Sequence, residues 1–322
     1  MALRIVFLGT PEFAVPTLEV LLASAHELVG VVTSPDKPRG RGQRPLPTPV
    51  KQVALQAGIA VLEPESLKDP VFLATLRAWR PDLAVVVGFR ILPPEVFRLP
   101  RYGSINLHAS LLPRYRGPAP VHWAILRGEV ETGVTTFLLE EGVDTGPILL
   151  QRRCPIGPEE TAGELQERLM HLGARLVLET IEGLEAGTLR PRPQPQEGAS
   201  YAPKVNRQMA QVPWHEPAQV VHNWIRGLSP HPGAWTRHGA VELTLYRSRL
   251  AQGSGRPGEV IAADRRLIIA CGEGAVEILE LQRPNRKRLS AEAFLRGYRI
   301  KPGSILDKAV QELPAPWGKT GF

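Results

Sequence analysis

The 322-residue sequence lacks features that mark several common classes of protein. It has only two cysteines, Cys154 and Cys271, and because they are far apart they form neither a CxxC metal motif nor a disulfide framework. Its apolar runs, such as Leu83–Val87, are far shorter than the roughly 18–20 residues of a membrane-spanning helix. The start, Met1–Gly9, is too short for a signal peptide and is typical of a strand. We therefore expect no membrane span and a reducing cytoplasm.

Two cofactor motifs are also missing. The eight histidines include no HxxxH or HxxEH pair, so a metal enzyme is the least favoured class and no metal is expected. The turn Gly9–Phe13 lacks the GxGxxG pattern that binds a dinucleotide, which argues against a dehydrogenase.

The net charge of +7 is concentrated in one part of the chain. Residues 201–322 hold 18 Lys and Arg against 10 Asp and Glu, a net charge of +8, whereas residues 1–200 hold 21 against 22, a net charge of −1. This division favours two domains with different tasks. The basic part is a candidate for binding a polyanion such as a nucleic acid, although a basic surface can also serve solubility alone.

The first two hundred residues alternate between short apolar runs and helical periodicity. Strands are expected at Leu3–Leu8, Leu28–Thr33, Leu83–Val87, Ser104–His108 and Val134–Leu139, and helices at Glu12–Ala23 and Glu160–Glu185. This alternation predicts an α/β domain with a mostly parallel sheet, in which ligands bind at the carboxyl ends of the strands.

The pattern changes near residue 190. Residues 190–206 begin with a run rich in proline and polar residues, and they predict a linker between a domain over residues 1–189 and another over residues 207–322. The second domain has one short helix, Pro217–Gly227, followed by short strands separated by glycine-bearing turns. That pattern predicts a small β barrel or sandwich, and an OB-like barrel is one such fold that binds nucleic acids.

One loop of the first domain, residues 35–49, is both basic and rich in glycine and proline. Its cations are Lys37, Arg39, Arg41 and Arg44, and Lys51 follows, against a single acid, Asp36. Because glycine and proline disfavour regular structure, we expect an irregular loop that reaches toward phosphates. An ordinary mobile surface loop is the alternative.

The densest polar motif runs from Ser104 to Pro113. If residues 105–108 form a strand, Ile105 and Leu107 point into the core, whereas Asn106 and His108 point together to the other face. A carboxamide and an imidazole then meet at the end of a strand. Alone, Asn-x-His is weak support for a site, since such a histidine is more often structural.

A second motif, Glu141–Gly146, places Asp144 between two glycines. It is compatible with an Asx turn of no further function. Aspartic proteases also use Asp-Thr-Gly, but they need two copies and this sequence has one. With Asn106 and His108, however, Asp144 would suit acyl or formyl transfer. The amide and a protonated imidazole would stabilise the oxyanion, while the carboxylate orients the imidazole and helps to deprotonate an attacking amine.

Several motifs together resemble the folate-dependent formyltransferases. They are the run Ile105–Pro120, the blocks Gly133–Thr135 and Gly142–Gly146, and the opening Ile5–Phe13. The basic loop with residues 47–51, and the segments Tyr201–Lys204 and Ile225–Trp235, narrow the resemblance to the branch of this family that acts on a tRNA.

The resemblance implies a Rossmann-like N-terminal domain, an OB-like C-terminal domain, and transfer of a formyl group from 10-formyltetrahydrofolate to methionyl initiator tRNA. It implies that Asn106, His108 and Asp144 are catalytic and that Ser110, Leu111, Leu112 and Pro113 line the folate site. The cations expected to contact the tRNA are Lys37, Arg39, Arg41, Arg44, Lys204, Arg286 and Lys287. A monomer is expected, because nothing in the sequence demands a partner chain.

The sequence departs from the family at one place. A Tyr-Gly pair is usual shortly before Ile-Leu-Pro, near the pterin, whereas Gly88 and Phe89 stand there in this chain. Two alternatives stay open. A formyltransferase for an amino-sugar nucleotide or another small amine would share the three site residues without needing the basic loop. A non-enzymatic RNA-binding protein would need the charge but not those three residues.

Overall fold

The computed structural model describes residues 2–39 and 44–306, and the chain divides into two compact units. The first comprises residues 1–117, 132–154 and 166–202, and the second comprises residues 118–131, 155–165 and 203–322. The chain thus passes to the second unit for the last time between residues 202 and 203, within the expected linker. Residues 118–131 and 155–165, which we expected in the first domain, group with the second unit.

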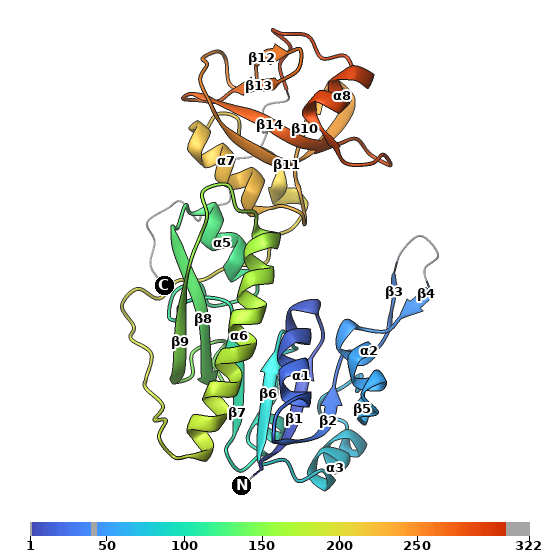
Figure 1. Cartoon of the computed structure of the whole chain (residues 1–322), viewed down its shortest axis with the longest axis vertical. Coiled ribbons are helices and arrows are strands. Elements are labelled where there is room, and N and C mark those ends of the chain that lie inside the picture. Colours follow the sequence, from blue (N-terminus) through green and yellow to red (C-terminus); the bar gives the residue numbers. More distant parts are fainter. Residues whose placement is uncertain (1, 40–43, 307–322) are drawn as a thin grey trace. The chain divides into compact units, whose positions relative to one another are not determined.

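A seven-stranded sheet in the order β5-β2-β1-β6-β7-β8-β9 forms the centre of the first unit (Figure 1). The strands are β1 Arg4–Gly9, β2 Glu27–Val32, β5 Val61–Leu62, β6 Leu83–Val87, β7 Ser104–His108, β8 Glu131–Leu138 and β9 Ile148–Pro155. Neighbours from β5 to β7 are parallel, and β7 and β8 are antiparallel. All five residues of β6 are buried, as expected for a central parallel strand. The predicted mostly parallel α/β sheet is confirmed.

Two helices of this unit, α2 Pro49–Gln56 and α3 Pro70–Ala78, begin at a side chain that caps them. The unit also contains α1 Val15–Leu22, α4 Pro94–Phe97 and most of α6 Ala162–Glu185. The side chains of Thr48 and Asp69 accept hydrogen bonds from the first turns of α2 and α3, and a proline follows each. Helix α6 packs closely on β7, since a Cβ on Gly173 would lie 2.6 Å from the Leu107 side chain. This contact places Leu107 in the core, as predicted.

The second unit has an antiparallel sheet in the order β10-β11-β14-β13-β12, with β15 paired to β14. Its elements are α5 Pro120–Leu126, α7 Ala218–Gly227, β10 Ala234–His238, β11 Val241–Ala251, β12 Val260–Ala263, β13 Leu267–Ala270, β14 Ala275–Gln282, β15 Leu289–Ser290 and α8 Ala291–Gly297. The sheet curls into a half-barrel, which confirms the OB-like expectation. Trp214 and Trp224 are each 1% exposed and belong to the core.

The basic loop contains regular structure, contrary to our expectation. Strand β3, Lys37–Arg39, pairs antiparallel with β4, Arg44–Leu46, to form a hairpin. Pro38 stands opposite Pro45 in this hairpin. A two-stranded ribbon tolerates prolines because half of its N–H groups face outward and donate to no neighbouring strand.

Candidate active site

Two of the three predicted catalytic side chains meet near the carboxyl end of β7. His108 is the last residue of this strand, and Asp144 lies in the β8–β9 connection; their side chains are 7% and 14% exposed. His108 Nδ1 lies 3.7 Å from Asp144 Oδ2. This distance suits an ion pair with a protonated imidazole but is too long for a direct hydrogen bond. Asp144 Oδ2 accepts its hydrogen bond from Gly117 N at 2.7 Å.

A backbone group orients the His108 ring. Nε2 of His108 lies 2.8 Å from the carbonyl oxygen of Tyr115. A carbonyl oxygen only accepts hydrogen bonds, so Nε2 must carry the hydrogen. Nδ1 is then the nitrogen that faces Asp144, and Tyr115, rather than Asp144, fixes the ring.

Asn106 occupies the same strand two residues earlier. It is half-buried and lies between Val86 of β6 and Phe137 of β8. No described residue forms a hydrogen bond with its carboxamide. Its N–H groups are therefore available to donate to a ligand.

The loop after β7 divides into supporting and accessible residues. Ser110 and Leu112 are buried. The Ser110 hydroxyl donates to a carbonyl oxygen four residues on at 2.6 Å, and Thr135 Oγ1 donates to the Ser110 carbonyl at 2.6 Å. Leu111 and Pro113 remain half-buried. Of the four residues predicted to line a folate site, Leu111 and Pro113 thus offer the side-chain surface, whereas Ser110 and Leu112 hold the loop in shape.

The reversed pair Gly88–Phe89 has a structural reason. Gly88 has φ +58°, a left-handed conformation that favours glycine, and a Cβ there would lie 2.7 Å from the Pro11 ring. Phe89 packs against the core, and the Arg90 guanidinium lies 5.2 Å from the centre of its ring. A glycine is therefore required at position 88, the first position of the pair, which accounts for the order Gly88–Phe89.

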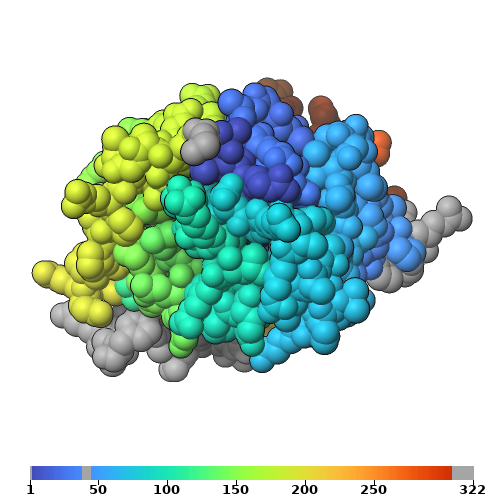
Figure 2. Space-filling model, turned by 90° about the horizontal axis from the view of Figure 1, so that it is seen from below, coloured from blue at the N-terminus to red at the C-terminus, as the bar shows by residue number. Residues whose placement is uncertain are grey.

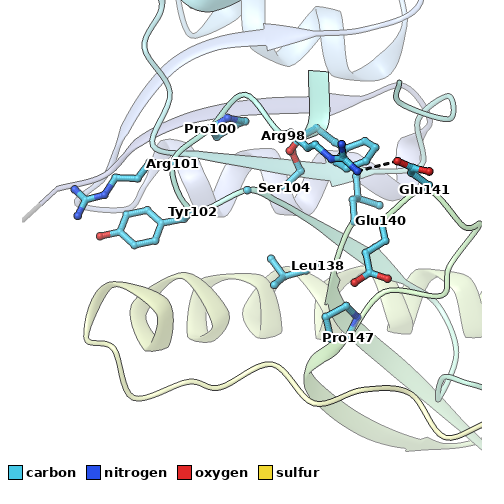
Figure 3. A pocket seen from close by; sticks show the side chains of 12 residues that line it. Arg98, Pro100, Arg101, Tyr102, Ser104, Leu138, Glu140, Glu141 and Pro147 are labelled. Atoms are coloured by element: carbon cyan, nitrogen blue, oxygen red, sulfur yellow. Dashed lines mark hydrogen bonds and ion pairs between the residues drawn. The ribbon is translucent and has the colours of Figure 1, made fainter. Parts of the chain in front are cut away.

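Among the cavities described in the first unit, two have volumes of about 600 Å³ or more. One of about 600 Å³ lies beside Ser104, the first residue of β7, and is lined by the end of α4 and by the α4–β7 and β8–β9 connections (Figure 3). In this cavity, Arg98 Nη2 donates a hydrogen bond to Glu141 Oε1 at 2.8 Å. The other, of about 630 Å³, is lined by residues 90–94, which follow β6, and by residues 65–68. None of Asn106, His108 and Asp144 lines either cavity, but the second lies at the carboxyl end of a parallel strand, where such sheets bind ligands.

The cations predicted to contact tRNA occur on both units. The exposed ones are Lys37, Lys204, Arg286 and Lys287, while Arg41 and the side chains of Arg39 and Arg44 fall outside the described residues. Arg286 and Lys287 lie in the β14–β15 turn, where no described carboxylate pairs with either. The neighbouring Arg288, by contrast, is paired with Glu280. Arg286 and Lys287 therefore keep their charge for an external anion.

Lys51, which we counted among the charges of the basic loop, is neutralised within the first unit. Its Nζ lies 2.7 Å from Asp36 Oδ2 and 2.8 Å from Glu63 Oε2. The hydrogen bonds to Asp36 and Glu63 raise the pKa of Lys51 above its usual 10.5. Lys51 thus ties the base of the β3–β4 hairpin to α2 instead of offering a charge to a ligand.

Lys51→Met is expected to lower the Tm at neutral pH, because it leaves Asp36 and Glu63 together without a cation. The raised pKa means that the stabilisation is complete below pH 10.5 and is lost as the pH rises through the folded-state value. The Tm difference from wild type should therefore narrow above pH 10.5, as measured by circular dichroism. The exposed Lys68→Met is the control, and a difference that stays constant with pH would contradict the ion pair.

Within residues 2–39 and 44–306, no three His, Cys, Asp or Glu side chains are grouped as a metal site would require. In the same ranges no helix combines the length and the apolar character needed to cross a membrane.

Comparison with known proteins identifies both domains. Residues 3–181 match the formyl transferase family, and residues 204–299 match the formyl transferase C-terminal domain. The chain is 47% identical to the methionyl-tRNA formyltransferase of Trichlorobacter lovleyi over 94% of this chain and 96% of that one. It is 47% identical to that of Moorella thermoacetica over 94% of this chain and 99% of that one.

Solved structures share the fold at lower identity. HypX from Aquifex aeolicus, solved with tetrahydrofolic acid, has a TM-score of 0.66 at 23% identity; the match covers 94% of this chain and 49% of HypX. WlaRD, a sugar 3N-formyl transferase, has a TM-score of 0.63 at 20% identity, covering 89% of this chain and 100% of WlaRD. Since the family match alone spans more than half of the chain, this protein belongs to the formyl transferase family and carries both of its domains.

Proposed function

We propose that this protein transfers the formyl group of 10-formyltetrahydrofolate to the amino group of methionyl initiator tRNA in the cytoplasm. The products are formylmethionyl-tRNA and tetrahydrofolate. The observation that supports this substrate is the 47% identity to methionyl-tRNA formyltransferases over 94% of the chain, basic C-terminal domain included. The site geometry supports the chemistry.

Asn106 is proposed to stabilise the oxyanion. When the amine attacks the formyl carbon, the carbonyl oxygen gains negative charge, and a fixed N–H donor stabilises that charge more than it stabilises the substrate. Asn106 is suited to this role because its carboxamide has no partner among the described residues. Its backbone is also fixed between two neighbouring strands.

His108 and Asp144 are proposed to handle protons and charge together. A protonated His108 donates through Nε2 to Tyr115, which leaves its Nδ1–H facing the Asp144 carboxylate and the reacting groups. The Asp144 carboxylate then lies opposite this positive charge, with Oδ2 3.7 Å from Nδ1. Oδ2 of Asp144 is committed to Gly117, whereas Oδ1 has no described partner and is free to take a proton from the attacking amine.

The folate is proposed to bind between two loops of the first unit. Leu111 and Pro113 supply side-chain surface on one loop. The other is the loop after β6, whose cavity of about 630 Å³ is lined by residues 90–94. Ile91 in this loop is 77% exposed and provides apolar surface for an aromatic ring.

A formyl-transfer assay tests the proposed function. The protein is mixed with labelled methionyl initiator tRNA and 10-formyltetrahydrofolate, and the amino acid released from the tRNA is separated by chromatography. Formylmethionine is expected. If no methionine is formylated while formylfolate is consumed with an amino-sugar nucleotide, the tRNA substrate is wrong although the formyl-transfer chemistry stands. If neither amine is formylated, both are wrong.

Arg286→Gln combined with Lys287→Gln is expected to raise the KM for tRNA and leave kcat unchanged. The slope of log KM against log salt should fall by about 1–2, because each phosphate contact adds roughly 0.9 on duplex nucleic acid. Arg256→Gln is the matched control, since Arg256 is exposed on the same unit and already paired with Glu259. An unchanged KM and slope in the double variant would exclude this turn from the tRNA interface.

A further inference from the structure

Residues 190–202, which we expected to be part of a linker between the two domains, group with the first unit. The backbone of Arg192 exchanges hydrogen bonds of 2.7 and 2.8 Å with that of Ile148 at the start of β9. At the other end, Arg116 N donates to Ser200 O at 2.8 Å, and Ala202 N donates to Arg116 O at 2.7 Å. Both ends of this segment are therefore fastened. Figure 2 shows the yellow part of the chain that follows α6 lying against the green part that contains β9.

Gln194 is the residue of the run 191–198 that turns inward. Residues 191–193 and 195–198 are exposed, whereas Gln194 is half-buried. Prolines at 191, 193 and 195 restrict the backbone to extended conformations, which keeps Gln194 in a defined place. An inward polar side chain in an otherwise exposed run indicates a specific contact.

The Gln194 carboxamide has partners for all of its functional atoms. Its Nε2 donates to the carbonyl oxygens of Asp144 and Gly146, both at 2.8 Å. Its Oε1 accepts from Arg116 Nε at 3.1 Å and from Arg116 Nη2 at 2.7 Å. Because carbonyl oxygens only accept and the guanidinium only donates, this arrangement fixes which end of the amide faces Asp144.

The turn that Gln194 holds needs external support. Asp144 has φ +53°, a left-handed conformation that a non-glycine residue rarely adopts. Residues 190–202 also support the contact between Gly117 and Asp144, in which Gly117 N donates to the carboxylate. Tyr201 covers Gly117, since a Cβ on Gly117 would lie 2.5 Å from the Tyr201 ring. The backbone and the carboxylate of Asp144 are thus both held in place by residues 190–202.

We propose that Gln194 is a positioning residue for the Asp144 carboxylate, acting through the Asp144 and Gly146 carbonyls, and that residues 190–202 are part of the catalytic centre. This inference rests on the proposed role of Asp144. Gln194 itself does not touch the reacting atoms. It keeps Asp144 at the distance from His108 at which the two charges interact.

Gln194→Ala in the full chain tests the proposal. We expect kcat for formyl transfer to fall by about 10–100-fold, because a carboxylate displaced by a fraction of an ångström loses its geometry with the reacting groups. The KM values for tRNA and for formylfolate should change less than about 2-fold, since Gln194 contacts neither substrate in this arrangement. Gln196→Ala is the matched control, an exposed glutamine of the same run whose side chain has no hydrogen bond to a described residue.

A double-mutant cycle separates positioning from general support of the fold. In an Asp144→Asn background, Gln194→Ala should cost little further activity if Gln194 acts through the carboxylate. An equal loss in both backgrounds, or a normal kcat for Gln194→Ala, would overturn the proposal. If Asp144→Asn alone has normal activity, it is the proposed role of Asp144 that fails.

Gln194→Glu provides a second variant if Gln194→Ala does not fold. It is nearly the same size and keeps an acceptor for Arg116, but an ionised carboxylate donates nothing to the two carbonyls. It should lose kcat as well, with a Tm close to that of wild type. A Gln194→Glu protein with full kcat would overturn the proposal.

Discussion

Asn106→Ala is expected to lower kcat by about 10²–10³-fold, with little change in the KM of either substrate. The loss falls on kcat because the oxyanion that Asn106 stabilises forms only on the way to the transition state. The fold should be unaffected, since no described residue depends on this carboxamide for a hydrogen bond. Single-turnover formyl transfer at saturating substrate measures the effect.

Asn206→Ala is the matched control for this variant. Asn206 is an exposed residue of the second unit, and its Oδ1 accepts from Met209 N at 3.1 Å. Losing that bond should affect stability slightly and leave kcat unchanged. A near-normal kcat for Asn106→Ala would remove Asn106 from the mechanism.

Asp144→Asn is expected to lower kcat by about 10²–10⁴-fold, the range over which a positioned acid or base contributes. The asparagine has nearly the same size, and its amide oxygen still accepts from Gly117 N. The change therefore removes the negative charge beside His108 and the proton acceptor, but leaves the turn intact. Initial rates of formylmethionyl-tRNA formation at saturating substrate measure the loss of kcat.

Asp69→Asn applies the same substitution to a carboxylate with a purely structural task. Asp69 Oδ1 accepts from Val71 N at 2.8 Å at the start of α3, and asparagine caps a helix about as well as aspartate. This control should have wild-type activity. If Asp144→Asn behaves like Asp69→Asn, the charge of Asp144 has no part in the reaction.

Strands buried on both faces were the easiest part of the fold to predict. The observed bounds of β6 equal the predicted ones, because a short apolar run between turns has few other stable arrangements. The bounds of β7 also equal the predicted ones, although this strand alternates apolar and polar residues. Strand β9 was missed, since at the edge of the sheet it mixes buried and exposed residues without regular alternation. The grouping of residues 118–131 with the second unit depends on contacts distant in the sequence, which periodicity does not reveal.

The candidate site could be predicted only as far as its side chains have a characteristic pattern. His108 and Asp144 were expected together and lie together. The carbonyl of Tyr115 and the N–H of Gly117 were not expected, because every residue has these groups and no residue type marks them. Gln194 was also missed, since a glutamine in a proline-rich run is more typical of an interdomain connection.

The hydrogen bond between His108 Nε2 and the Tyr115 carbonyl leaves Nδ1 as the only ring nitrogen that can exchange a proton with other groups. A ring that keeps one hydrogen throughout turnover does not relay protons from one side to the other. From its cationic form it can give up a proton, and later regain one, only at Nδ1, beside the Asp144 carboxylate that is proposed to take the proton of the amine. In the proposed reaction, the proton lost by the attacking amine and the proton gained by the departing folate nitrogen would therefore pass through the same small volume, one after the other.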